Sequence, residues 1–298
     1  MILVTGATGN VGGDVLRGLL ELGVPVRAAV TDPIRAGSTL SAGASLVRFD
    51  FNDPTTFGPA LEGVRRVFLM RPPMMGDPKA FQPFLEAMKF INVEQVVFLS
   101  LLGAQSNPVV PHRKLELAIE KLSLPHVFLR PSFFLQNLST THLQDILERD
   151  DLFVPAGNGR TSFIDARDIA AVAVKVLTLP HVVNGGIDLT GAKALTYSEV
   201  AKIFSEVLGR KITYSDPTPP KFGLEMRRRG MKNEFVNVMI LIYTTNRFGL
   251  AARVTGDVER ILGRKPLTVG DFVRDFRHVF TKQPSDSSPE GGADSRST

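Results

Sequence analysis

Apolar positions in the first half of the chain alternate between short, nearly continuous runs and longer stretches with helical spacing. The short runs predict strands at 1–5, 24–30, 44–50, 64–70, 95–100 and 126–130. Apolar residues recurring every three or four positions predict helices at 11–22, 81–91 and 111–122. Strands separated by helix-length segments form βαβ units, and continuous apolar runs are typical of buried central strands. We therefore expect an α/β fold with a doubly wound parallel sheet and helices on both faces.

The second half of the chain predicts a smaller, helix-rich lobe. A turn feeds a helix at 164–177, a short strand is expected at 186–189, and further helices at 196–208 and 268–276 open with the Thr-x-x-Glu and Thr-x-x-Asp patterns of a capping box. The apolar run VNVMILIY at 236–243 predicts a buried helix face. We predict a nucleotide-binding domain at 1–150 that takes sheet contributions from about 151–190, a substrate or partner lobe at 191–282, and a disordered tail at 283–298.

Composition and charge exclude several classes of site. The chain has no cysteine and five scattered histidines, so disulfides and thiolate sites are excluded and no metal site is expected. The net charge is +5, but the densest basic run, Arg227–Arg229, is short and lacks interleaved aromatic residues, so no nucleic-acid partner is expected. No leader and no apolar run of about 20 residues is visible. We expect a cytoplasmic protein without a membrane span.

Four glycines fall in ten residues between the first predicted strand and the first predicted helix, in VTGATGNVGG at 4–13. The spacing is Gly6-x-x-Gly9-x-x-Gly12. In a dinucleotide-binding turn, Gly6 would allow the tight bend, Gly9 would let the backbone approach a diphosphate, and Gly12 would let helix and strand pack closely. The helix amides would then face the negative charge. The alternative is a glycine-rich turn without a ligand.

This glycine pattern is accompanied by further motifs in a fixed order. They are FDFND at 49–53, VFLMRPP at 67–73, VVFLSLLGA at 96–104, HRKLE at 112–116, LRPSFFLQNL at 129–138 and SFIDARDIA at 162–170. With them the chain, from Met1 to about Phe280, resembles the NmrA-like branch of the atypical short-chain dehydrogenases/reductases. That branch includes type 2 quinone reductases, isoflavone-reductase relatives and NmrA-type redox sensors. The resemblance implies a Rossmann-type domain that binds NAD(P) across the carboxyl ends of its strands.

The resemblance also implies where the cofactor lies. Thr8, Gly9, Asn10 and Val11 would meet the diphosphate, with Gly6 and Gly12 shaping the turn, and Asp50 and Phe51 would flank the adenine. Asp50 has the alternative role of a turn cap. Asp32 favours NAD, since a carboxylate there binds a ribose hydroxyl and repels a 2′-phosphate. Thr31 and Arg35 could reach that phosphate, although Arg35 could equally be a surface residue, and NADP(H) is slightly favoured because the branch uses it.

The expected catalytic end departs from the usual short-chain pattern. No Tyr-x-x-x-Lys pair exists, and the three tyrosines lie outside the expected helix at 111–122. His112 stands at or near the place where relatives carry the active-site lysine; it could bind the ribose and donate a proton near neutral pH, or simply cap the helix. Ser100 would contact substrate or nicotinamide, or close a turn. Arg71 and Pro72 would line the groove, and Phe133 would meet the nicotinamide or belong to the core.

Two functions follow from these residues. The first is an NAD(P)H-dependent oxidoreductase that passes a hydride to a quinone or a similar electron-poor small molecule, an acceptor that needs little proton help at carbon. The second is a non-catalytic sensor of NAD(P)(H) that acts through a protein partner, for which the apolar and basic segment 226–248 would supply a surface. The missing tyrosine motivates both, and a protein partner is expected only for the sensor.

Overall fold

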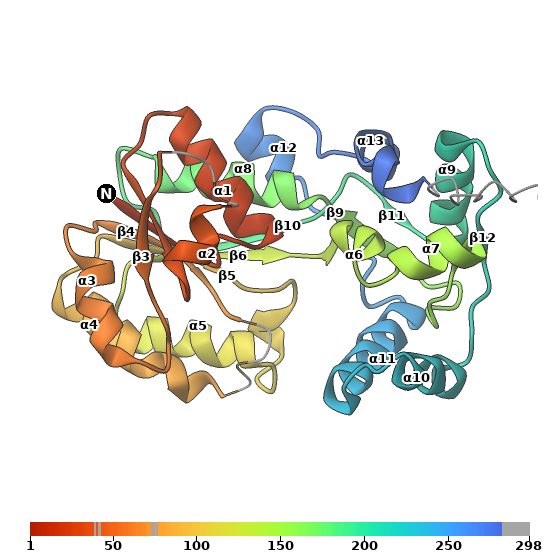
Figure 1. Ribbon diagram of the computed structural model, residues 1–298, viewed down its shortest axis with the longest axis horizontal. Coiled ribbons are helices and arrows are strands. Elements are labelled where there is room, and N and C mark those ends of the chain that lie inside the picture. The colour runs from red at the N-terminus through yellow and green to blue at the C-terminus, as the bar shows by residue number, and fades with distance from the viewer. Residues whose placement is uncertain (39, 41–42, 73–74, 76, 282–298) are drawn as a thin grey trace, which may run out of the picture.

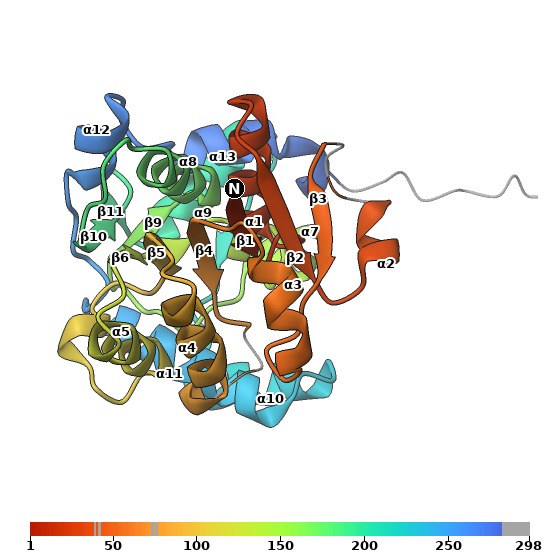
Figure 2. The same cartoon turned by 90° about the vertical axis from the view of Figure 1, so that its left-hand side faces the viewer.

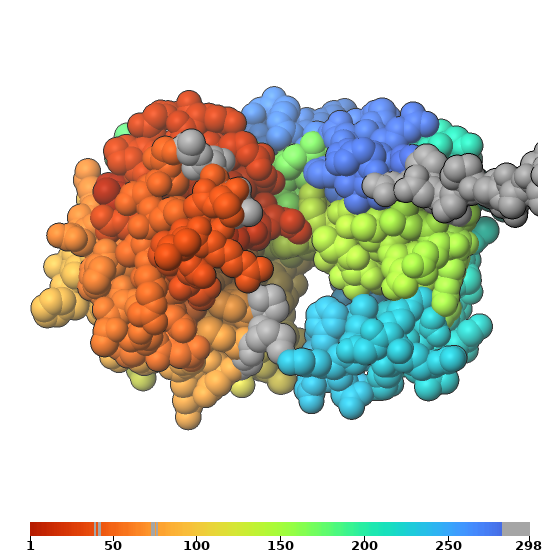
Figure 3. All heavy atoms as spheres, viewed as in Figure 1, coloured from red at the N-terminus to blue at the C-terminus, as the bar shows by residue number. Residues whose placement is uncertain are grey.

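The computed structural model describes residues 1–38, 40, 43–72, 75 and 77–281, arranged as two lobes side by side (Figure 1). The tail expected to be disordered, 283–298, lies outside the described residues. The first lobe holds the large sheet and the second holds small sheets and several helices. Figure 3 shows the molecule hollowed between the first lobe and the part of the second that carries α10 and α11.

A seven-stranded sheet forms the centre of the first lobe, and all of its neighbouring strands are parallel. Its order is β10 (Gly185–Leu189), β6 (His126–Pro131), β5 (Gln95–Leu99), β4 (Arg66–Met70), β1 (Ile2–Thr5), β2 (Val26–Val30) and β3 (Ser45–Arg48). The chain starts in the middle, winds outward to β3, and then returns through β4 to the other side. The doubly wound parallel sheet is thereby confirmed. Because the strands are parallel, their carboxyl ends all lie at one edge of the sheet, called the carboxyl edge below.

Helices cover both faces of this sheet (Figure 2). One face carries α1 (Asn10–Glu21), α8 (Ala166–Leu177) and α12 (Asp257–Leu262), and the other carries α3 (Phe57–Leu61), α4 (Gln82–Phe90) and α5 (Pro111–Lys121). Alternate strand residues supply the two cores: Phe68 packs with α1 and α8, whereas Val67 and Leu69 pack with α3 to α5. The short α2 (Pro33–Gly37) and the 3-10 turns η1 (Pro54–Thr56), η2 (Pro78–Phe81) and η3 (Ala104–Ser106) complete the lobe.

The second lobe is built from short strands and six helices, among the residues described. Its strands are β7 (Phe133–Phe134), β9 (Thr161–Ile164) and β11 (Ala194–Leu195) in one sheet, and β8 (Asp151–Leu152) and β12 (Thr213–Tyr214) in another. Its helices are α6 (Gln136–Ser139), α7 (Leu143–Arg149), α9 (Tyr197–Leu208), α10 (Pro219–Arg228), α11 (Asn233–Arg247) and α13 (Val269–Asp275), followed by the 3-10 turn η4 (Arg277–Phe280). Both expected capping boxes are present, at Thr196–Glu199 and Thr268–Asp271.

The packing of the two cores suggests lobe boundaries other than the expected 1–150, with sheet contributions from about 151–190, and 191–282. Leu135, Ile146 and Phe153 belong to the core of the second lobe, whereas Val258 of α12 packs back on the first. The chain therefore enters the second lobe directly after β6 and crosses more than once. We propose a second lobe made of 133–163, 191–250 and 268–281, with the earlier boundaries at 150 and 190 replaced.

Helix α11 contains the apolar run that was expected to be a buried face, and that expectation is only half right. Val236, Met239 and Tyr243 are buried, but Val238 and Leu241 on the opposite side are exposed, at 51% and 65%. Apolar residues therefore surround the helix, so the run alone could not identify the packed side. Within the described part of the chain, no helix is both long and apolar enough to cross a membrane.

Candidate functional site

The glycine turn after β1 has the shape that a dinucleotide-binding loop requires. Gly6 has φ of +63°, the left-handed region where a side chain is strained. A Cβ on Gly12 would lie 2.1 Å from the carbonyl oxygen of Gly6, so only glycine lets α1 pack this closely on the turn. Gly9 is the N-cap of α1, and its amide donates to the Gly6 carbonyl at 3.0 Å. Gly6 and Gly12 therefore have distinct structural reasons to be glycine, whereas the backbone conformation of Gly9 and the space around it would admit a side chain.

The N-terminus of α1 opens onto a cavity of about 440 Å³ between the lobes. Thr8, Gly9 and Asn10 line it, and no side chain among the described residues caps the helix. The first amides of a helix lack partners within the helix, and their dipoles favour an anion. Val11 is buried in the core, so only its backbone can take part. This end of α1 is thus free to bind a phosphate group.

Two further residues, Arg167 of the SFIDARDIA motif and Gln136 of the LRPSFFLQNL motif, line this cavity, and the sequence analysis did not single them out. Arg167 lines it beside Gln136, and its guanidinium bonds Asp165 at 2.8 Å and Asp275 at 2.6 Å. These hydrogen bonds raise the pKa of Arg167 against the opposing effect of its burial. The Gln136 amide donates to Asp165 at 2.9 Å, which ties the second lobe to the start of α8. The two motifs that contain Arg167 and Gln136 were the signals available in the sequence.

At the end of β2, Thr31, Asp32 and Arg35 lie exposed beside the glycine turn, because β2 neighbours β1. Asp32 has a role that the sequence interpretation did not assign. Its carboxylate caps α2, accepting from the amides of Ile34 at 3.0 Å and Arg35 at 3.1 Å. The carboxylate therefore has a fixed position at the edge where a ribose would lie, and Arg35 is on the same short helix.

At the end of β3, the two residues expected to flank the adenine differ. Phe51 is only 7% exposed, and its ring packs on Phe81 with the centroids 4.5 Å apart. The expectation that this ring packs on the base is corrected, because the ring belongs to the core over α4. Asp50 accepts from the Asn52 amide at 2.8 Å, so it also forms the turn that was its alternative role.

At the end of β4, Arg71 and Pro72 lie half-buried beside the glycine turn. The Arg71 guanidinium donates to the carbonyls of Pro72 at 3.1 Å and Met75 at 2.6 Å, which fixes the loop after the strand. Burial, and then the positive charge of Arg71, lower the pKa of His112 to about 4 against the opposing charge of Glu116. His112 is therefore a neutral imidazole at pH 7, which corrects the expectation of a proton donor near neutral pH.

At the end of β5, Ser100 joins a buried ionic network. Its hydroxyl donates to Glu116 at 2.7 Å, and Glu116 also accepts from Arg130 at 2.8 and 3.0 Å and from Arg113 at 3.0 Å. Glu116 was noted in the sequence only as a residue on the helix of His112, and Arg130 was not singled out. The spacing of four residues between His112 and Glu116 places both on one side of α5.

The remaining expected residues lie in the second lobe. Phe133 is half-buried, and its ring packs against Phe163 at 5.9 Å and Tyr243 at 5.8 Å. Tyr197 and Tyr243 are buried, and the Tyr214 hydroxyl donates to the carbonyl of Gly157 at 3.0 Å. No tyrosine therefore stands at the carboxyl edge of the large sheet. Phe133 packs against the core of the second lobe, which is one of its two expected roles, and its contact with the nicotinamide stays a prediction.

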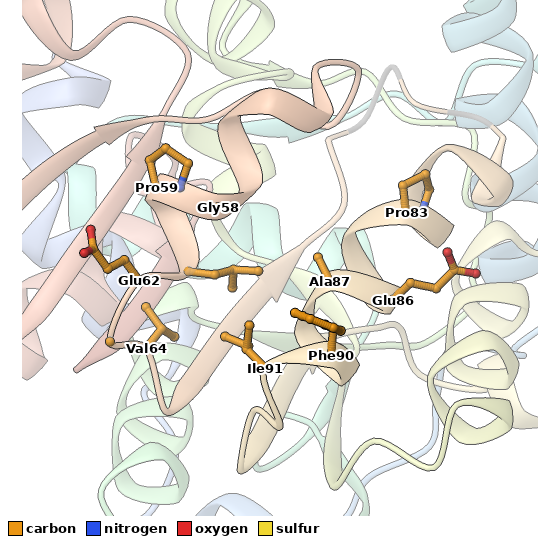
Figure 4. A pocket seen from close by; sticks show the side chains of 11 residues that line it. Gly58, Pro59, Glu62, Val64, Pro83, Glu86, Ala87, Phe90 and Ile91 are labelled. Carbon is orange, nitrogen blue, oxygen red and sulfur yellow. The ribbon is translucent and has the colours of Figure 1, made fainter.

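A larger hollow, about 1010 Å³, lies elsewhere and does not belong to this site. Figure 4 shows it between α3 and α4, with Phe90, Ile91 and Val64 along its floor. These residues precede β4 and β5, so the hollow opens at the amino ends of the strands. Ligands of doubly wound sheets bind at the carboxyl ends instead. Its lining is mostly apolar and holds no group suited to a nucleotide phosphate.

Two relatives are similar to this chain along almost its whole length. An NAD(P)H azoreductase of Xenophilus azovorans is 33% identical over 284 residues, which cover 94% of this chain and 99% of that protein. Prestalk A differentiation protein A of Dictyostelium discoideum is 31% identical over 278 residues, covering 92% of this chain and 91% of that protein.

Solved structures share the fold. An NADPH-dependent quinone oxidoreductase of Escherichia coli, in complex with NADPH, superposes with a TM-score of 0.84 at 22% identity, covering 94% of this chain and 100% of that one. The triphenylmethane reductase of Citrobacter sp. with NADP(H) gives 0.80 at 24%, covering 92% and 99%. The model of the NmrA-like family matches residues 1–273, and the chain therefore belongs to the NmrA-like family.

Proposed function

We propose that this protein is an NAD(P)H-dependent oxidoreductase that reduces quinones or similar electron-poor small molecules. The observation that carries the proposal is the glycine turn, in which Gly12 lies too close to Gly6 for any side chain and the uncapped start of α1 faces a cavity. The open amides at such a helix end can bind a phosphate group where a cavity gives it access. The azoreductase relative, similar along nearly its whole length, supports a reductase.

The residues at the carboxyl edge fit a nicotinamide dinucleotide. The amides of Asn10, Val11 and Gly12 would hold its diphosphate, Asp50 would meet the adenine, and Arg71 would border the groove. Buried side-chain atoms without a partner among the described residues, His112 Nδ1 and Ser132 Oγ, lie at the same edge. Such atoms ordinarily find a partner, and a bound ligand can provide it. When bound, the reduced cofactor supplies a hydride.

NADP(H) is slightly preferred over NAD(H) in this proposal. Arg35 and Thr31 are exposed at the end of β2 and can approach a 2′-phosphate. Asp32 opposes this, because its carboxylate, fixed as the cap of α2, repels that phosphate. The preference is accordingly expected to be small, and replacing either charge should move it.

The chain's own residues favour an acceptor that needs no acid at its reacting carbon. His112 is neutral, and no tyrosine stands at the described carboxyl edge. Hydride addition to a quinone gives a phenolate whose charge is delocalised, and this anion takes its proton from water. The protein then contributes mainly by holding donor and acceptor close and aligned. A simple ketone would give an alkoxide and would require a strong proton donor.

Loss of NADPH absorbance with a panel of small quinones tests the proposal. Gly9→Asp places a carboxylate at the open end of α1, and Gly9 has φ of −92°, which aspartate adopts readily, so the variant should fold and lose turnover. Gly58→Asp is the matched control, since Gly58 is exposed with nothing within 4 Å of an added Cβ. Activity that survives in Gly9→Asp would refute the assigned site.

A sensor that binds NAD(P)(H) without turnover is the second candidate. The observation that favours it is the exposed apolar side of α11 and the turn after it, which includes Phe235, Val238, Leu241, Phe248 and Leu250. The basic run offers less: Arg229 is ion-paired with Asp145 at 2.7 Å. Binding of NADPH with no consumption across the panel, together with a large difference in affinity between NADPH and NADP⁺, would favour the sensor.

A further inference from the structure

The carboxylate of Glu116 is fully buried beneath the carboxyl edge and has no part in the function proposed above. One of its oxygens accepts from Ser100 Oγ at 2.7 Å and from Arg130 Nε at 2.8 Å. Its other oxygen accepts from Arg130 Nη2 and Arg113 Nη1, each at 3.0 Å. Two guanidinium groups and one hydroxyl therefore hold it in a single orientation.

This environment fixes the charge of Glu116. Burial raises the pKa of the carboxyl, but the hydrogen bonds from Arg130, Ser100 and Arg113 outweigh it and hold the pKa below its ordinary value. Glu116 is therefore ionised, and an ionised carboxylate only accepts hydrogen bonds. The proton between the two groups must belong to the Ser100 hydroxyl. That hydroxyl is left with lone pairs and no proton to offer.

Ser100 is 4% exposed and lies at the carboxyl edge, where ligands of doubly wound sheets bind, so its polarity would decide which ligand group it could bind. It directly follows β5, and its amide donates to the Leu129 carbonyl at 2.8 Å, which fixes the backbone. His112, on the same side of α5 as Glu116, has a buried Nδ1 without a partner in the described part of the chain. The edge beside Ser100 thus contains a second polar atom that awaits a partner.

We propose that Glu116 is a positioning residue that makes the Ser100 hydroxyl an acceptor, which binds an N–H or O–H group of a bound ligand. Ser100 then does not donate to the carbonyl oxygen of the electron acceptor. The donor group has two sources, the carboxamide of the nicotinamide or a hydroxyl on the electron acceptor. This inference rests on the proposed function, because it takes both ligands from it.

Calorimetric titration with NADP⁺ and with its 3-acetylpyridine analogue tests the first source. The analogue keeps the carbonyl and lacks the N–H donors, and calorimetry suits a chain without tryptophan. The wild type should bind NADP⁺ about fivefold more tightly, the worth of one neutral hydrogen bond. Ser100→Ala should bring the ratio of the two dissociation constants to about 1, and Ser100→Thr, which keeps a hydroxyl, should restore it.

Glu116→Gln tests whether Glu116 must orient the Ser100 hydroxyl or whether the presence of that hydroxyl is enough. A glutamine amide can donate to Ser100, which turns the serine proton outward, so the ratio should fall as in Ser100→Ala. Arg113→Gln is the matched control, since it removes a bond to the other oxygen of Glu116 and leaves the contact with Ser100 intact. The ratio should persist there. An unchanged ratio in Glu116→Gln, where Ser100→Ala lowers it, would overturn the positioning role.

The second source is tested by kcat/KM for 2-hydroxymethyl- and 2-methyl-1,4-naphthoquinone. If Ser100→Ala removes a preference for the hydroxylated quinone and leaves the nucleotide ratio unchanged, the donor is on the electron acceptor. If Ser100→Ala moves neither ratio, the acceptor role of Ser100 is overturned while the proposed function stands. If the wild type binds neither nucleotide, the proposed function fails as well, so the two failures are distinguishable.

Discussion

Replacing His142 by glutamine should flatten the decline in stability of this protein at acid pH. His142 is fully buried in the second lobe, where its Nε2 forms a short hydrogen bond with the Tyr243 hydroxyl. Burial, and then the positive charge of Arg229, lower the pKa of His142 from 6.5 to about 4. Between these two pH values the His142 imidazole is protonated in the unfolded chain and neutral in the folded chain. The free energy of unfolding therefore falls as the pH falls from about 6.5 to 4.

The size of the effect follows from the two pKa values of His142. Linkage between 6.5 in the unfolded chain and about 4 in the folded one gives a loss of about 2 kcal/mol between pH 7 and pH 5. Domains are ordinarily stable by only about 5–15 kcal/mol, so this loss is measurable. It acts on the contact between α7 and α11, and hence on the second lobe.

Urea unfolding followed by circular dichroism at pH 7, 6 and 5 measures the effect. His142→Gln keeps a side-chain partner for Tyr243 and cannot titrate, so its free energy of unfolding should fall by about 2 kcal/mol less than that of the wild type over this range. His181→Gln, at an exposed histidine, is the control and should follow the wild type. An equally steep fall in His142→Gln would refute the reasoning, because the buried imidazole would then not be the group that titrates.

Three further outcomes are expected. Gly12→Ala should destabilise the protein by about 1–3 kcal/mol, as overpacking does, because its Cβ would lie 2.1 Å from the Gly6 oxygen, whereas Gly58→Ala should not; thermal unfolding measures both, and equal melting temperatures would contradict the close packing. Asp32→Asn keeps the helix cap and removes the charge, so the ratio of kcat/KM for NADPH to that for NADH should rise severalfold; a constant ratio would exclude repulsion of the 2′-phosphate. Turnover should be flat from pH 6 to 8, since the pKa of His112 is about 4; an inflection near 6.5 that disappears in His112→Ala would contradict this.

The seven strands of the first lobe and its longer helices were predictable because each has a local signal, whereas the short helices α2, α3 and α12 were not predicted. Buried parallel strands give continuous apolar runs, and the glycine turn has a backbone reason for glycine at Gly6 and at Gly12. The strands of the second lobe gave no such signal, since β7, β8, β11 and β12 have two residues each and depend on partners far along the chain. The path of the chain between the lobes was not predictable either, because no local sequence pattern marks where the chain crosses from one lobe to the other.

The candidate site was likewise predictable only where a local motif marks the residue. Motifs identified Ser100 and His112, but the partners that set their chemistry come from elsewhere: Arg130 reaches Glu116 from β6, and Arg71 influences His112 from the loop after β4. Residue type alone suggested that His112 titrates near neutral pH. Its burial decides otherwise, and burial is a property of the packed fold.

The polarity of the side chains at the candidate site would determine which electron acceptors the protein can reduce. His112 is neutral, the Ser100 hydroxyl donates its proton in a hydrogen bond to the ionised Glu116, and Tyr197 and Tyr243 are buried in the second lobe. In the described part of the edge, no side chain is then poised to protonate a developing alkoxide. A reductase with this edge would select acceptors by the stability of the anion they form, and quinones meet that condition. If proton supply restricts the range of acceptors, introducing an acid, as in Ser100→Tyr, should extend turnover toward simple ketones. An unchanged acceptor range in a folded variant would show that the shape of the cleft restricts it instead.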